Sequence, residues 1–137
     1  MAFSIRQMQL AAQWLAALLA LGIPLALLVG GAQPFAVGLV HAPWDKPAHM
    51  AVYAVLACAI GFASRRHGPS AMLIGFAGAM LVGALDEALQ MYLPGRLAEL
   101  DDLVADAVGA ALGTAVLAVR VQLKMWVAAA HEESGRS

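Results

Sequence analysis

Four long apolar runs, separated by short polar or Pro- and Gly-containing segments, dominate the sequence. The first run contains no charged residue over about 20 positions, which is enough for a helix to cross a hydrocarbon core roughly 30 Å thick. The pattern therefore predicts an all-α protein with four membrane-spanning helices. The expected spans are residues 10–29, 47–63, 70–93 and a fourth that begins at Asp101 or Asp102 and continues through Val119 towards Trp126.

Helix-breaking and capping residues mark the predicted connections. Pro94-Gly95 predicts the end of the third helix, because the residue before proline avoids the helical region and glycine accepts a left-handed conformation. Asp101 or Asp102 is expected to cap the fourth helix by accepting its free N–H groups. Glu99 and Asp101 are otherwise expected to be solvated loop charges. The remaining connections are a loop over residues 30–44 and a basic turn over residues 65–69.

The first apolar run has an alternative interpretation as a secretory signal peptide, since Arg6 precedes it. The apolar region of such a peptide has about 7–15 residues, and this run is longer. We therefore expect an uncleaved helix. Pro24 lies within it and can be tolerated there, with a possible kink.

The composition agrees with a membrane protein. Of 137 residues, 62% are apolar and 12% charged, whereas soluble domains have about 45–50% and 25%. The formal net charge of −1 argues against nucleic-acid binding, which uses a basic surface. The single cysteine, Cys58, allows no disulfide within the chain and no Cys-rich metal motif, and we expect neither a metal nor a cofactor. The length indicates one domain: residues 1–9 are an N-terminal segment, 10–127 the four-helix domain and 128–137 a polar tail.

The positive charges predict the orientation. With four spans, both termini and the turn after the second span lie on the same side, where most Arg and Lys residues are found. Because such residues favour the cytoplasmic side, we expect an antiparallel up-down bundle with both termini cytoplasmic. The cytoplasmic side then has Arg6, Arg65, Arg66, Arg120, Lys124 and Arg136, and the outer side has Lys46 and Arg96.

Each of the last three predicted helices has one face on which polar or small residues recur. Residues three or four apart share a face of a helix. Gly109 and Gly113 form a G-x-x-x-G pattern, which permits close helix approach. The three stripes are Asp45, Lys46, His49 and Tyr53; Gly75, Ala79, Gly83, Asp86 and Gln90, with Glu87 at the rim; and Asp102, Asp106, Gly109 and Gly113.

The polar residues also share one depth. Asp86 precedes Leu93 by seven residues, or roughly 10 Å at 1.5 Å per residue, and Asp106 lies about 6 Å below Asp102. His49 is in the first turns of its helix. All three therefore lie in the outer half of the membrane, and we expect a shared polar pocket that opens to the cell exterior.

Two adjacent acids inside a span, Asp86 and Glu87, require compensation, because a charge in hydrocarbon costs about 2.5–3.5 kcal/mol on insertion scales. Protonation, water or a cation can provide it. The available cations are Lys46 and Arg96, and Arg96 is also a candidate partner of Asp102. We expect a functional role for this pair of acids.

These motifs together resemble the VanZ-like membrane proteins. The resemblance runs from about Trp44 to Val119, and it rests on the order and spacing of the motifs on apolar helices. One position departs from the family pattern, which usually has Asn where this chain has Asp106. The motifs are D-K-x-x-H-x-x-x-Y from Asp45, D-E-x-x-Q from Asp86, P-G-R from Pro94 and D-x-x-x-D-x-x-G-x-x-x-G from Asp102.

The resemblance implies a multi-pass protein of the bacterial inner membrane with a cell-envelope role. The family takes its name from a protein associated with low-level teicoplanin resistance, so it also implies a relation to glycopeptide resistance. From the residues, we expect the pocket to bind a phosphorylated lipid or lipid-linked precursor, with Lys46 and Arg96 holding the phosphate. The expected ligand-binding residues are Asp45, Lys46, His49, Tyr53, Asp86, Glu87, Gln90, Arg96, Asp102 and Asp106.

A membrane-embedded enzyme is the alternative. His49 is then the general base and Asp86 or Glu87 its orienting carboxylate. Alternatively, these three residues with Asp102 and Asp106 ligate a divalent metal. A proton or ion pathway is disfavoured because the inner halves of all four helices look apolar, and a scaffold that only locks helices together is the remaining reading.

Overall fold

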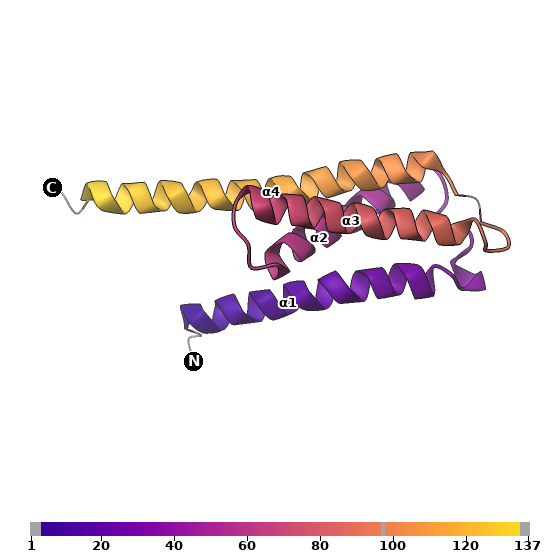
Figure 1. Cartoon of the computed structure of the whole chain (residues 1–137), viewed down its shortest axis with the longest axis horizontal. Coiled ribbons are helices and arrows are strands. Elements are labelled where there is room, and N and C mark those ends of the chain that lie inside the picture. Colours follow the sequence, from indigo (N-terminus) through magenta and orange to yellow (C-terminus); the bar gives the residue numbers. More distant parts are fainter. Residues whose placement is uncertain (1–3, 97, 135–137) are drawn as a thin grey trace.

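The computed structural model describes residues 4–96 and 98–134 of the chain. Four long helices account for most of it (Figure 1). All four are long and apolar enough to cross a membrane, which confirms the predicted all-α, four-helix architecture. The elements are α1 (Ile5–Leu25), the π-helical turn η1 (Ala26–Gly30), the 3-10 helix η2 (Pro34–Ala36), α2 (Asp45–Ala63), α3 (Pro69–Gln90) and α4 (Leu100–Ser134).

Successive helices run in opposite directions (Figure 1). Both ends of the chain and the α2–α3 turn lie at one end of the bundle, here called the terminal end. The loop between α1 and α2 and the loop between α3 and α4 lie at the opposite end, here called the loop end. This is the predicted up-down order.

Helix α1 begins at a capping box and packs mainly against α2. The Ser4 side chain accepts a hydrogen bond from the Gln7 backbone N–H (3.2 Å), and the Gln7 side chain accepts one from the Ser4 N–H (2.9 Å). The cap therefore satisfies two backbone donors that the helix leaves free. Ala16 is the only buried residue of α1 in the described part of the chain, so most of this helix lies on the surface of the bundle.

Two boundaries differ from the sequence-based prediction. Helix α3 ends at Gln90 rather than Leu93, and the chain turns before Gly95, whose φ of 78° suits glycine. Helix α4 begins at Leu100, so Asp101 and Asp102 lie in its first turn and the predicted cap is wrong. Acids in a first turn still interact favourably with the helix dipole.

The predicted polar tail is also helical over much of its length. Helix α4 continues to Ser134 and projects beyond the other helices at the terminal end (Figure 1). Residues 1–3 and 135–137 of the two predicted terminal segments, including Arg136, lie outside the described residues.

The small-residue stripes bring the helices into close contact. Gly109 and Gly113 of α4 face the backbone of α2 at Met50 and Ala54, so closely that a Cβ at either glycine would overlap a carbonyl oxygen. Gly75 of α3 meets the Ala57 carbonyl in the same way. The core beside these contacts consists of Tyr53, Leu56, Ala57, Ala79 and Ala110.

Replacing one of these glycines should separate α2 from α4. We expect Gly113→Ala to lower stability by about 1–3 kcal/mol, the usual cost of overpacking, because backbone atoms of Ala54 cannot move aside as a side chain can. The melting temperature of the purified protein in detergent measures this. Gly22→Ala is the matched control, since its added methyl meets nothing within 4 Å and alanine favours helix. Equal melting temperatures for the two variants would contradict the packing role.

Candidate functional site

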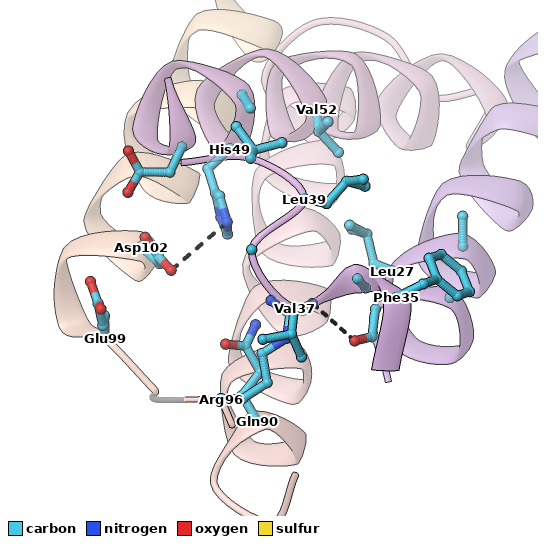
Figure 2. Close-up of a pocket in the computed structure, with 18 of the residues that line it drawn as sticks. Leu27, Phe35, Val37, Leu39, His49, Val52, Gln90, Arg96, Glu99 and Asp102 are labelled. Carbon is cyan, nitrogen blue, oxygen red and sulfur yellow. Dashed lines mark hydrogen bonds and ion pairs between the residues drawn. The ribbon is translucent and has the colours of Figure 1, made fainter. Parts of the chain in front are cut away.

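A pocket of about 600 Å³ opens at the loop end of the bundle. Its wall combines apolar side chains from η1, η2 and the loop before α2 with polar side chains from α2, α4 and the loop after α3 (Figure 2). Six of the ten predicted ligand-binding residues line this pocket. Lys46 is bonded to two lining residues, whereas Asp86, Glu87 and Asp106 do not line the pocket. The polar lining residues are Asp45, His49, Tyr53, Gln90, Arg96, Glu99 and Asp102.

Lys46 lies among three carboxylates at the rim of this pocket. Its ammonium group donates hydrogen bonds to Asp102 Oδ1 and, at 3.0 Å, to Glu99 Oε2, and Asp45 Oδ2 lies 3.6 Å away. The Asp102 side chain is only 15% exposed, so this ion pair is partly shielded from water. Lys46 therefore joins the first turn of α2 to the first turn of α4.

His49 lies between two acids of α4. Its Nδ1 is 2.8 Å from Asp106 Oδ1, and its Nε2 is 3.8 Å from Asp102 Oδ2 (Figure 2 shows the second contact). Asp106 is almost completely buried, at 1% exposure, and the ring of Tyr53 stacks on the His49 ring with 6.2 Å between centroids. A carboxylate on Nδ1 fixes the orientation of the imidazole and assigns the proton to that nitrogen.

The acids of α3 have partners other than those predicted. Gln90 Nε2 donates to Asp86 Oδ2 (3.0 Å), and the Glu99 backbone N–H donates to Glu87 Oε2 (2.9 Å). Neither acid is bonded to His49, so the prediction that Asp86 or Glu87 orients the histidine is wrong, and Asp106 has this position. Glu87 instead holds the loop that precedes α4.

Arg96 contacts the end of the first span. Its Nη2 donates to the Gly31 carbonyl oxygen at 3.0 Å, while its Nε is buried without a hydrogen-bond partner in the described part of the chain. No ion pair joins Arg96 to Asp86 or Asp102, so the predicted pairing is wrong. Asp102 is paired with Lys46 instead.

Sequence reasoning missed two parts of the site. Glu99 was assigned to solvent, yet it bonds Lys46 and lines the pocket. The apolar wall formed by Phe35, Val37 and Leu39 was also missed, although an apolar stretch within an otherwise loop-like segment was a visible signal. Over residues 4–96 and 98–134, no group of three or more His, Cys, Asp or Glu side chains has an arrangement suited to a metal ion.

Four apolar helices with a polar pocket at one end define a multi-pass membrane protein. The sequence model of the VanZ/LLP1 family matches residues 3–121. The match covers most of the chain, which therefore belongs to the VanZ/LLP1 family, and the predicted resemblance is confirmed. No curated protein and no solved structure matches the chain.

The contact between Lys46 and Asp102 should contribute to stability. We expect Lys46→Gln to lower the free energy of unfolding by about 1–3 kcal/mol. The lower limit is typical of exposed ion pairs, and the upper limit applies when a buried charge loses its partner. Asp102→Asn should relieve much of this loss in the double variant, which a double-mutant cycle of melting temperatures detects. Asp101→Asn, which changes an exposed neighbour, is the control. Additive effects of Lys46→Gln and Asp102→Asn would contradict the coupling.

Proposed function

We propose that this protein binds a phosphorylated membrane lipid or a lipid-linked precursor in the pocket at the loop end. The observation that carries the proposal is the two-sided wall of the pocket. Leu27, Phe35 and Leu39 offer an apolar surface, and His49 and Arg96 offer polar groups in the same space (Figure 2). Ligand pockets typically combine an apolar lining with a few polar groups that fix orientation, and this one suits a molecule with an apolar chain and a polar head.

Arg96 is the residue best placed to hold the phosphate. Its Nε is buried without a partner, and one edge of the guanidinium is already fixed by the Gly31 carbonyl. A guanidinium can bond phosphate through two parallel N–H groups. Lys46, which was expected to share this role, is engaged by Asp102 and Glu99, and its contribution is to position those two acids.

Tyr53 supplies a second polar group without a partner. Its hydroxyl is buried, has no hydrogen bond within the described residues and belongs to a side chain that lines the pocket. An unsatisfied buried polar group costs about 1–3 kcal/mol. A bound head group that accepts from this hydroxyl would remove the cost.

The charge distribution supports placing this pocket on the extracytoplasmic side of a bacterial inner membrane. Arg6, Arg65, Arg66 and Arg120 belong to the terminal end, and the positive-inside rule assigns that end to the cytoplasm. A ligand from the outer leaflet would then reach the pocket. An envelope role agrees with membership of a family that takes its name from a protein associated with teicoplanin resistance. A relation of this chain to glycopeptide resistance can be tested by comparing the glycopeptide susceptibility of cells with and without the protein.

Binding of a polyprenyl phosphate in detergent solution tests the proposal. We expect Arg96→Gln to weaken binding by about 10-fold or more, because a hydrogen bond to a charged group contributes about 1.5–3 kcal/mol. Native mass spectrometry measures the bound fraction. The uncharged polyprenol should bind the wild-type protein more weakly than the phosphate does, and should bind both proteins alike.

Arg6→Gln is the control, because it removes a positive charge at the terminal end and leaves the pocket intact. Equal affinity of the wild-type protein and Arg96→Gln for polyprenyl phosphate would overturn the phosphate assignment. Absence of binding of both the phosphate and the polyprenol to the wild-type protein would overturn the proposed pocket ligand.

The contact between His49 and Asp106 favours a second candidate function, acid/base catalysis on an envelope lipid. Asp106 bonds Nδ1 and leaves Nε2 as the proton acceptor in a residue that lines the pocket. In hydrolysis of a lipid diphosphate, Nε2 would take a proton from water while the water oxygen bonds to the terminal phosphorus. The bridging P–O bond would break, and the lipid phosphate would leave.

Release of inorganic phosphate from polyprenyl diphosphate tests this candidate. We expect His49→Gln to reduce the rate by at least about 100-fold, since general base catalysis contributes typically 10²–10⁴-fold. His41→Gln, which replaces an exposed histidine in the neighbouring loop, should retain the wild-type rate. Wild-type protein that binds the diphosphate without releasing phosphate would exclude this reaction and leave the binding function intact.

A further inference from the structure

A second, smaller cavity lies at the terminal end of the bundle, away from the proposed lipid pocket. Its volume is about 100 Å³, whereas one buried water needs about 10–15 Å³. All four helices contribute to its lining, as does the turn between α2 and α3. The lining residues used below are Phe62, Arg65, Arg66, His67, Gly68 and Arg120.

We propose that this cavity binds the phosphate group of an anionic membrane lipid. The proposal concerns a separate site and does not depend on the function of the pocket at the loop end. It rests on three features: an uncompensated set of arginines, a fixed geometry of those arginines, and a position at the end of the membrane spans.

The cavity is strongly positive. Arg65, Arg66 and Arg120 all line it, and no acidic residue does. Among the side chains that the structure describes, none of the three forms an ion pair. Glu133 is 13 residues beyond Arg120, which places it about 20 Å farther along α4. The arginines thus lack the neutralising carboxylates that surround Lys46 at the loop end.

The geometry of the cavity is held by contacts within the chain. The Arg120 guanidinium lies over the Phe62 ring, with its carbon 4.1 Å from the ring centroid. Such a cation–π contact fixes the plane of the guanidinium, while the N–H groups at its edge remain able to bond phosphate. Arg120 is therefore positioned before a ligand arrives, which reduces the entropy lost on binding.

The turn beside Arg120 is fixed as well. The Ser64 hydroxyl donates to the Gly61 carbonyl at 2.7 Å and accepts from the Arg66 N–H at 3.2 Å. Helix α3 then starts at Pro69, and its N-cap residue, Gly68, provides no side-chain hydrogen bond to the first turn. The N-terminus of α3 adds its partial positive charge to that of the arginines.

The position of the cavity matches the depth of lipid phosphate groups. Arg65 and Arg66 are two and three residues beyond Ala63, the last residue of the second span, so they lie at the depth of the lipid head groups. Basic pockets between membrane helices on the cytoplasmic side bind anionic head groups. Phosphate is the shared chemistry, and a membrane lipid or a free phosphate ion can supply it.

Native mass spectrometry of the purified protein with phosphatidylglycerol tests the proposal. We expect Arg66→Gln and Arg120→Gln each to weaken lipid binding by about 10-fold or more, as loss of a charge-assisted hydrogen bond implies. Arg120→Lys keeps the charge without the two-pronged geometry and should fall between wild type and Arg120→Gln. Arg66→Gln leaves the contact with Phe62 intact, so it tests binding even if Arg120→Gln fails to fold.

Arg6→Gln is the matched control, because it removes an arginine at the same end of the bundle that does not line the cavity. If millimolar inorganic phosphate displaces the lipid from the wild-type protein, and Arg66→Gln binds inorganic phosphate more weakly, the phosphate site is supported and its ligand is the free ion. Competition by chloride at the same ionic strength would count against a phosphate site. Equal binding by wild type, Arg66→Gln and Arg120→Gln, or an equal loss in Arg6→Gln, would overturn the proposal.

Discussion

The close approach of α4 to α2 determines where the polar residues meet. Gly113 faces Ala54 and Gly109 faces Met50, and farther along the same two helices Asp106 contacts His49. These contacts follow the same order on both helices, as expected for two parallel members of an up-down bundle. Without side chains on the two glycines, the backbones come close enough for short side chains such as Asp106 to bridge the helices.

Charge is distributed unequally between the two ends of the bundle. At the loop end, Lys46 bonds Asp102 and Glu99, so the positive charge of this lysine is compensated within the protein. At the terminal end, Arg65 and Arg120 have no such compensation in the described residues. A charged side chain near hydrocarbon requires a partner. The lysine at the loop end has partners within the chain, and the arginines at the terminal end are left to interact with water or lipid.

Periodicity predicted much of this architecture because it reports which residues share a face of a helix. Asp86, Gln90 and Asp106 are buried on the expected faces, and the four apolar runs became four helices. The ends were less predictable. The segment after Val119 contains neither proline nor glycine up to Ser134, so nothing local stops α4 where the hydropathy falls.

The pattern could not predict which side chains on different helices bond to one another. Such contacts depend on how two helices are shifted along their axes relative to each other, and not on the residue spacing within one helix. Asp86 or Glu87 was the predicted orienting carboxylate of His49, and the packing of α2 on α4 places Asp106 there instead. Arg96 bonds a backbone carbonyl, that of Gly31, and side-chain patterns carry no information on such an acceptor. Glu99 joined the site because Glu87 holds its backbone N–H.

The selected partner also explains how the departure at position 106 can be accommodated. The resemblance to the VanZ-like proteins implies Asn there, and both Asn and Asp present an oxygen that can accept from His49 Nδ1. The orienting hydrogen bond is therefore available with either residue, whereas Asp adds a negative charge. Lys46 does not bond Asp106, and the hydrogen-bond partner of this acid is the imidazole of His49. In this chain the side chain at position 106 consequently orients His49.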